Sequence, residues 1–324
     1  MLAAALAAIA LAVPSGPAVA FGDAQHGWAG GRGGVFQTND GGASWKRVAG
    51  GRVLELRALD ARTAWALEPR AVVRMTGGTS WIRDGTLPLA ALAPVTASEA
   101  FALDRSGLLR RTPDGLAWPR VPSAPTGLQA LCFASPSLGW VARGGSVWTT
   151  HDGGSRWSAT RLLPTRQGFP IPQLACRGSD VWAVFHEGAA AGTEGYHVLR
   201  SLDDGSSWKA VLGSPAQRRL PPISNYAGPV SALGGGRAVF VGWCGPCGRL
   251  QPTVTIVRTS DGGRSFSRST PFDGFWPYDV SFVDSSRGFL LTGARGHGGI
   301  VWRTLDGGRV WRRVLSSAAL VSTP

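Results

Sequence analysis

The sequence predicts an all-β protein made of seven similar antiparallel sheets, and two repeated features lead to that prediction. A short segment of the form Ser/Thr-x-Asp-x-Gly-x-x-Trp/Phe occurs in five intact copies and two altered copies. A second aromatic residue precedes each copy and lies in a short apolar stretch that follows a turn. Self-similarity at a regular spacing is the sequence signature of a repeat architecture.

The first feature is an acidic turn followed by an aromatic residue. The intact copies begin at Thr38, Thr150, Ser201, Thr259 and Thr304. One altered copy has Thr76 where aspartate is expected, and another, starting at Thr112, is one residue shorter. The first and last aromatic residues of these copies are six repeats apart, which gives about 44 residues per repeat and matches one four-stranded propeller blade.

The second feature places an aromatic residue on the second strand of each repeat. Its seven members are Trp28, Trp65, Phe101, Trp140, Trp182, Phe240 and Phe289. Each repeat then divides into four short strands separated by Gly- and Asp-rich turns, a pattern typical of antiparallel sheet. We therefore predict a seven-bladed β-propeller of four-stranded antiparallel blades, with approximate blade boundaries at residues 17–50, 51–87, 88–123, 124–163, 164–213, 214–272 and 273–318.

The acidic turns are expected to be structural rather than catalytic. An aspartate can accept hydrogen bonds from the amides of its own turn, and glycine supplies the positive φ that such a turn needs. Calcium requires six to eight oxygen ligands, whereas most of these turns offer one carboxylate. We predict no metal and no cofactor, and a structural role for Asp40, Asp114, Asp152, Asp203, Asp261 and Asp306.

These segments resemble the Asp-box (BNR) repeats of sialidases, sortilin and bacterial surface propellers. The preceding element, His26-Gly27-Trp28-Ala29-Gly30 in the first repeat, is more specifically similar to the photosystem II stability/assembly factor family. The resemblance covers residues 17 to about 315. It implies a propeller in which an arginine-bearing face engages a protein client, but it transfers no functional residue to a particular position.

The N-terminal segment resembles an export signal. Met1 to Val13 is uninterrupted apolar sequence, shorter than the roughly 20 residues needed to span a bilayer and suited to the apolar part of a secretory signal. We predict a signal-like segment at residues 1–12 with cleavage near Ala12, a single propeller at 13–324, no stable membrane span, and a secreted, periplasmic or envelope-associated protein. The alternative is a buried N-terminal strand or helix.

The composition is that of a basic, folded protein. Hydrophobic residues make up 44% of the chain, which excludes a disordered protein, and 33 Lys and Arg against 20 Asp and Glu give a net charge of +13. This charge favours an acidic protein partner. We do not expect nucleic-acid binding, because the chain carries an export signal and none of the RNA-reading motifs. The oligomeric state stays open.

Insertions into the repeat predict a binding face. The two aromatic residues of a repeat are 16 or 17 residues apart in repeats one to four, but 22 to 26 apart in repeats five to seven. The extra residues fall in loops that leave one face of an up-and-down blade, opposite the acidic turns. These loops carry Tyr, Trp and Arg, the residues enriched at recognition surfaces. We predict a contact patch of Arg218, Arg219, Tyr226, Trp276 and Tyr278, with Tyr196 and Trp243 at its margin. The alternative is that these loops only pack on one another.

The four cysteines allow three pairings. Trp243-Cys244-Gly245-Pro246-Cys247 matches the thioredoxin motif, but β-rich sequence follows it, whereas in thioredoxin the motif opens a helix. A local Cys244–Cys247 disulfide is therefore favoured over a thiol-disulfide oxidoreductase. Cys132 and Cys176, on first strands of successive repeats, either pair or stay as buried thiols.

An enzyme is the main alternative to a binding protein. A sialidase-like glycoside hydrolase would need a Tyr/Glu nucleophile pair, and Glu187 and Glu194 share a loop with Tyr196. The Phe-Arg-Ile-Pro element of sialidases is missing, since the nearest string is Phe169-Pro170-Ile171-Pro172. We therefore favour a non-catalytic propeller that binds a protein client, or alternatively an envelope glycan.

Overall fold

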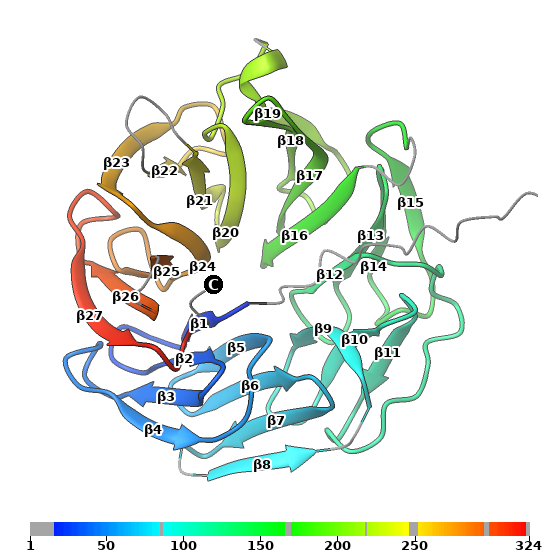
Figure 1. Ribbon diagram of the computed structural model, residues 1–324. Helices are drawn as coiled ribbons and strands as arrows, with labels where there is room; N and C mark the ends of the chain where they lie inside the picture. The colour runs from blue at the N-terminus through cyan, green and yellow to red at the C-terminus, as the bar shows by residue number, and fades with distance from the viewer. Residues whose placement is uncertain are drawn as a thin grey trace, which may run out of the picture.

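The protein is a seven-bladed β-propeller, as predicted, with one short 3-10 turn as its helical structure among the described residues. The computed structural model describes residues 16–78, 80–84, 87–165, 170–217, 219–245, 252–294 and 298–321. Figure 1 views the ring along its axis, with the first strand of each blade nearest the centre and the chain running once around.

The first four blades contain fifteen of the strands. Their bounds are β1 (Ala18–Phe21), β2 (Gly27–Gly31), β3 (Gly34–Thr38) and β4 (Lys46–Ala49) in blade 1; β5 (Glu55–Asp60), β6 (Thr63–Glu68), β7 (Ala71–Thr76) and β8 (Ser80–Asp84) in blade 2; β9 (Leu89–Pro94), β10 (Ala100–Asp104) and β11 (Leu109–Thr112) in blade 3; and β12 (Ala130–Phe133), β13 (Gly139–Arg143), β14 (Ser146–Thr150) and β15 (Ser158–Arg161) in blade 4.

The last three blades have longer strands on average. Their bounds are β16 (Ile171–Arg177), β17 (Asp180–Ala190), β18 (Thr193–Ser201) and β19 (Lys209–Gly213) in blade 5; the 3-10 turn η1 (Pro215–Gln217), β20 (Tyr226–Gly234), β21 (Arg237–Cys244), β22 (Thr253–Thr259) and β23 (Ser267–Asp273) in blade 6; and β24 (Trp276–Phe282), β25 (Gly288–Ala294), β26 (Gly298–Thr304) and β27 (Arg312–Ser317) in blade 7.

Blade 3 departs from the predicted four strands. Within the described residues its sheet has three strands, and a single bridge, Arg110 with Arg120, takes the place of the fourth. The residues on either side of this bridge include Pro119 and Pro122. Proline has no N–H to donate to a sheet ladder, so this segment cannot extend its pairing with β11.

The hydrophobic core consists of seven layers between neighbouring blades. The seven second-strand aromatic residues are each at most 1% exposed, and every core cluster combines residues of two adjacent blades. The layer that closes the ring joins Phe21 of blade 1 to Phe289 of blade 7, whose stacked rings have centroids 3.3 Å apart. Because each sheet is built of consecutive strands, this closure between first and last blade is non-covalent.

In five of the seven blades, an arginine on the third strand ties the blade to the next one. Arg303 Nη1 of blade 7 donates to the Gly41 carbonyl in the acidic turn of blade 1 over 2.8 Å. Arg200 Nε of blade 5 donates to Gly262 O of blade 6 over 2.7 Å. Arg74, Arg111 and Arg258 make the corresponding bonds to Ala97, Gly153 and Gly307. Part of the basic charge of the chain is thus used within the fold.

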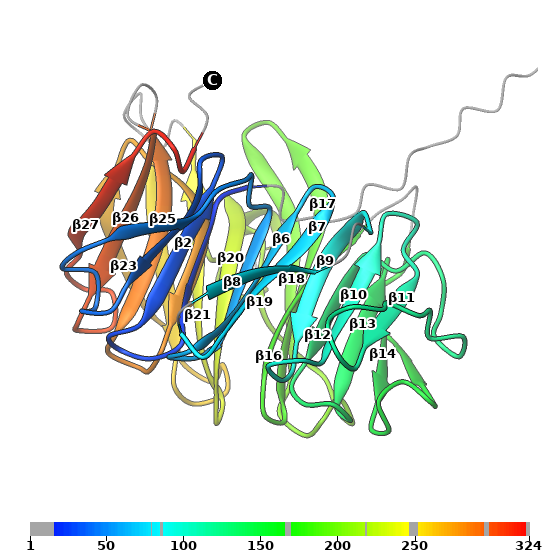
Figure 2. The same cartoon turned by 90° about the horizontal axis from the view of Figure 1, so that it is seen from below.

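The two rims of the ring differ. We call the rim with the loops between strands one and two and between strands three and four the aspartate-turn face. The other rim, with the loops between strands two and three and between blades, is the insertion face. Figure 2 shows the ring from the side, with the insertion face at the top, where β27 ends.

Candidate functional site

Four aromatic residues lie at the insertion face of blades 6 and 7, where the inner strands β20 and β24 begin. Tyr226 pairs with Trp243 across β20 and β21, and their rings stack with centroids 4.1 Å apart and an interplanar angle of 9°. Both are half-buried, as is Trp276 at the start of β24, and Tyr278 is 40% exposed. We call these four residues the aromatic patch. They are the part of the predicted contact patch that lies on one rim with open surface.

Local backbone geometry presents Tyr278 to solvent. The pairing of β24 with β25 shifts register between Pro277 and Asp279, so Tyr278 occupies a bulge. Its ring lies over Gly293, where a Cβ atom would approach Tyr278 Cε2 at 2.5 Å. Pro277 faces Gly228 of β20, since a Cβ at that glycine would lie 3.8 Å from Pro277 Cγ. The strands that carry the patch are therefore packed together, and they lie side by side at the ring centre in Figure 1.

The basic members of the predicted patch are placed in part. Arg219 is exposed in the segment between η1 and β20, and its side chain makes no hydrogen bond or ion pair with the described residues. Arg218 lies outside the described residues. Its contribution to the patch therefore stays a prediction.

The prediction that Tyr196 lies at the margin of the surface is wrong. Tyr196 is 0% exposed; its hydroxyl donates to Ser224 O over 2.8 Å and accepts from Ile223 N over 2.7 Å. Burial raises the pKa of Tyr196 to about 12. The loop before β20 folds back onto β18 and covers the ring, so in this part of blades 5 and 6 the insertions do pack on one another.

The same packing removes the Tyr/Glu pair that a sialidase-like mechanism would use. Glu194 Oε2 accepts a hydrogen bond from Ala227 N over 2.9 Å, and Oε1 lies 2.8 Å from His186 Nδ1. A buried phenol with a raised pKa, already engaged in three hydrogen bonds, is not an available nucleophile. These residues join blade 5 to blade 6.

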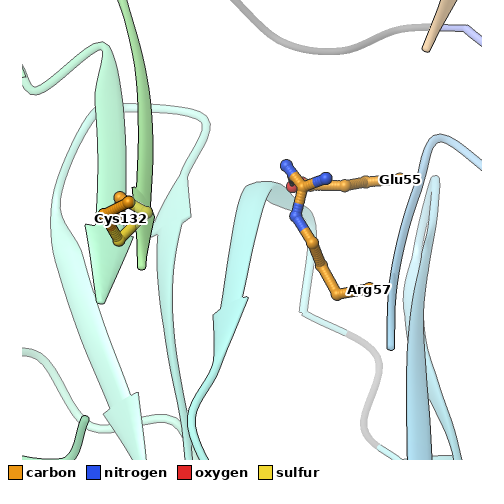
Figure 3. The surroundings of a disulfide bond; sticks show 4 residues. Glu55, Arg57 and Cys132 are labelled. Atoms are coloured by element: carbon orange, nitrogen blue, oxygen red, sulfur yellow. Dashed lines mark ion pairs between the residues drawn. A yellow bond between two sulfur atoms is a disulfide. The ribbon is translucent and has the colours of Figure 1, made fainter. Parts of the chain in front are cut away.

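A charged cluster inside the ring was not predicted as a site. Glu55 and Arg57 of β5 form an ion pair of 2.6 Å; the Glu55 side chain is 3% exposed, whereas that of Arg57 is 45% exposed among the inner strands. Glu55 Oε2 also accepts Leu92 N of blade 3, and Asp279 Oδ2 accepts Val19 N of blade 1. Figure 3 shows the Glu55 and Arg57 side chains pointing toward each other, with the Cys132 disulfide nearby.

The electrostatics of this cluster follow from enclosure by the inner strands. Burial raises the pKa of Glu55 despite its ion pair with Arg57. Burial also raises the pKa of Asp279 to about 6, and the charge of Arg57 opposes part of that rise. These charges interrupt inner strands that are otherwise rich in small apolar residues, such as Ala18–Phe21 and Leu89–Pro94, and that contrast was the available sequence signal.

The Cys132–Cys176 disulfide joins the inner strands β12 and β16 of blades 4 and 5, with Cα atoms 6.0 Å apart. Between blades 7 and 1, Ser281 Oγ of β24 accepts Phe21 N of β1, and between blades 6 and 7, Ser231 Oγ accepts Phe282 N. The disulfide thus links the inner strands of blades 4 and 5 covalently, whereas blades 7 and 1, and blades 6 and 7, are linked at their inner strands by a hydrogen bond.

The second cysteine pair is seen in part. Cys244 is buried and disulfide-bonded, and β22 follows from Thr253. Cys247 lies outside the described residues, so the Cys244–Cys247 pairing stays a prediction.

The acidic turns have the internal hydrogen bonds expected of them. In blade 4, Asp152 Oδ1 accepts the Arg156 amide over 2.8 Å and the Thr150 hydroxyl over 2.9 Å. Gly154, at φ 92°, donates to Thr150 Oγ1, and Trp157 Nε1 donates back to Gly154 O. Hydrogen bonds, of which that from the Ser44 side chain has the largest effect, lower the pKa of Asp40 to about 2. In the same way hydrogen bonds, first among them that from the Ser201 side chain, lower the pKa of Asp203 to about 2. Each carboxylate is engaged by its own turn.

Among the described residues, no three His, Cys, Asp or Glu side chains gather in a way that could hold a metal ion. Within the same residues, no helix has the length and apolar character to cross a membrane.

Comparison with known proteins identifies the class of fold. No protein-family model and no curated protein matches the sequence. A solved structure described as YCF48 bound to D1 peptide matches with a TM-score of 0.61 and 17% identity, over 91% of this chain and 95% of that one. Identity at this level shows a shared fold.

Glycoside hydrolases of family GH74 share the fold as well. The xyloglucanase from Xanthomonas campestris matches with a TM-score of 0.67 and 14% identity over 95% of this chain. The enzyme from Niastella koreensis matches with a TM-score of 0.65 and 14% identity over 93% of this chain. The present chain spans about half of their length, 55% and 54% respectively. Propellers of this shape therefore include both a peptide-bound protein and hydrolases.

Proposed function

We propose that this chain is a non-catalytic, exported β-propeller that binds a protein through the aromatic patch together with Arg218 and Arg219. The observation that carries the proposal is the partial exposure of Tyr226, Trp243, Trp276 and Tyr278 on one rim. Large aromatic side chains with one open face contribute most of the binding energy when a partner buries them. The partner is expected to be acidic, since the chain carries a net charge of +13.

The fold comparison supports a peptide or protein as the ligand. The YCF48 structure, of nearly the same length, contains a bound peptide. The Cys132–Cys176 disulfide supports an extracytoplasmic location, because disulfides persist in oxidising compartments. A role in the assembly or stability of the bound protein fits the resemblance of the repeats to the photosystem II stability/assembly factor family.

The experiment is affinity capture from the native cell envelope with the purified chain as bait, followed by measurement of Kd for the captured partner. The test variant combines Arg218→Glu, Arg219→Glu and Trp276→Ala. Its matched control, Arg264→Glu, Arg309→Glu and Leu305→Ala, makes the same two charge reversals and truncates one exposed apolar side chain on the aspartate-turn face. We expect binding at least about tenfold weaker in the test variant and unchanged in the control.

Salt dependence provides a second readout. Binding that rests on arginine–carboxylate pairs weakens as ionic strength rises. Unchanged affinity in a folded test variant would move the site off the insertion face. Capture of a glycan without protein, or turnover of a glycoside by the wild type, would favour the glycan-binding or hydrolase alternatives.

A further inference from the structure

A second candidate site lies on the aspartate-turn face between blades 3 and 4, on the rim opposite the aromatic patch. A pocket of about 620 Å³ is bounded by the segment after β11 and by the acidic turn of blade 4. Its volume is in the range of small-molecule sites, and the hollow is open to solvent rather than enclosed. Nothing in the proposed protein-binding function uses it.

The pocket occurs where the repeat is broken. Blade 3 has a shortened turn and no fourth strand, so its outer segment touches β11 at one bridge, Arg110 with Arg120. In the intact turns the tryptophan packs beside its own turn and donates to it, as Trp157 does to Gly154 O. Trp118 instead packs inward in an edge-to-face contact with Trp65. The outer layer of blade 3 is therefore incomplete beside blade 4.

The walls of the pocket are fixed by contacts between the two blades. Arg111 Nε donates to Glu99 Oε1 over 2.7 Å, and its Nη1 donates to Gly153 O over 3.3 Å. The Ser123 hydroxyl donates to Gly154 O. Gly154 has a φ of 92°, and a Cβ there would lie 3.1 Å from Val121 Cγ1. The pocket is thus built from residues held in place before any ligand arrives.

The lining combines an apolar surface with one uncompensated cation. Pro113, Pro119, Val121 and Pro122 contribute the apolar part, and the lining includes no carboxylate. Arg111 is neutralised by Glu99, and Arg110, across the bridge from Arg120, is paired with Asp104 over 2.8 Å. Arg120 is exposed, and its side chain forms no hydrogen bond or ion pair with the described residues.

This chemistry selects a ligand class. An apolar surface beside a single free guanidinium suits an apolar molecule that bears one carboxylate, since arginine pairs with carboxylate through two parallel hydrogen bonds. An added β-strand from a partner is disfavoured, because Pro119 and Pro122 remove the N–H groups that it would need at this edge. We propose that the pocket binds a small organic monocarboxylate with an apolar ring or chain, and that Arg120 pairs with the carboxylate.

The test measures binding of 1-naphthylacetate and of its neutral analogue 1-naphthylacetamide to the full chain by calorimetry. The test variant is Arg120→Gln. Arg156→Gln is the matched control, because Arg156 is an exposed arginine next to the pocket that does not line it. Ser155→Tyr places a larger side chain in the lining of the pocket. Thermal unfolding of each variant establishes that it is folded.

We expect 1-naphthylacetate to bind the wild type. Its Kd for Arg120→Gln should be higher by a factor of about ten or more, since a hydrogen bond to a charged group is lost. Binding of the amide should be the same in both, Ser155→Tyr should weaken both ligands, and Arg156→Gln should change neither. The proposal is overturned if the wild type shows no saturable binding at millimolar ligand. It is equally overturned if Arg120→Gln and Arg156→Gln behave alike, or if Ser155→Tyr binds 1-naphthylacetate as the wild type does.

Discussion

Replacing Arg303 with leucine should loosen the closure of the ring. Arg303 Nη1 reaches from β26 of blade 7 to Gly41 O in blade 1, over 2.8 Å. No peptide bond joins these two blades directly, and the remaining ties there are side-chain contacts and a few hydrogen bonds. Leucine keeps apolar contacts of the side-chain stem but removes the charged donor.

The magnitude follows from the type of bond that is lost. A hydrogen bond from a charged donor contributes roughly 1.5–3 kcal/mol, and we take about 2 kcal/mol for this half-buried guanidinium. For a chain of 324 residues the entropy of unfolding is about 0.7 kcal/mol/K, so that loss lowers Tm by about 3 °C. Local opening of the closure should speed amide exchange of Val19 and Phe21 by about 30-fold, because each 1.4 kcal/mol is a factor of ten. Their amides donate to Asp279 and Ser281 across the same junction.

Arg200→Leu is the matched control. Arg200 makes the equivalent bond from blade 5 to Gly262 of blade 6, over 2.7 Å, but the chain connects those blades directly. We expect a similar fall in Tm and no change in exchange at Val19 and Phe21. Equal acceleration of exchange at β1 in both variants, or exchange there at the wild-type rate in Arg303→Leu, would refute this role of Arg303.

Three further predictions concern pH, the acidic turns and the disulfide. The pKa of Asp279 is raised to about 6, so the unfolded chain loses this proton first and Asp279 should contribute a loss of at most about 3 kcal/mol of stability between pH 4 and pH 6. Urea unfolding should show a shallower decline in Asp279→Asn, with the raised pKa of Glu55 leaving a remainder; an unchanged decline would contradict the assignment. Asp152→Asn should lower Tm because its turn loses an ionised acceptor, and it should leave partner affinity unchanged; loss of affinity at unchanged Tm would assign Asp152 to binding instead. Replacing Cys132 and Cys176 with alanine should cost up to about 4 kcal/mol for a loop of 44 residues, and peptide mapping without reduction that finds both thiols free would refute the bond.

The repeat made most of the architecture predictable from the sequence. Seven buried second-strand aromatics, with Trp28 as the first and Phe289 as the last, are a property of short local segments that recur. Cys132 and Cys176 are 44 residues apart, about one repeat, and that spacing already placed them on adjacent inner strands. Local pattern could therefore indicate which strands are neighbours.

Contacts between segments that the repeat does not contain could not be predicted. Tyr196 belongs to an insertion, and its burial depends on how a separate loop, near Ser224, folds back over β18. Composition favoured a surface role, since tyrosine is common at interfaces, and the tertiary contact overrode it. The outer strand of the third blade is reduced to one bridge for a different reason: Pro119 and Pro122 were visible in the sequence and argue against a full fourth strand there.

The arginines show why net charge alone is a poor guide to a binding face. Several of them are taken up by internal bonds, as Arg303 is by Gly41 O and Arg57 by Glu55. Others, such as Arg312 and Arg313, lie exposed on the outermost strand of a blade, where charge discourages pairing with another sheet edge. The arginines with functional potential are those without either role that stand beside open apolar surface. Among the described residues, Arg120 meets that condition in the pocket of blade 3. Arg219 is exposed between η1 and β20 and has neither role, and the two binding experiments are built on these two arginines.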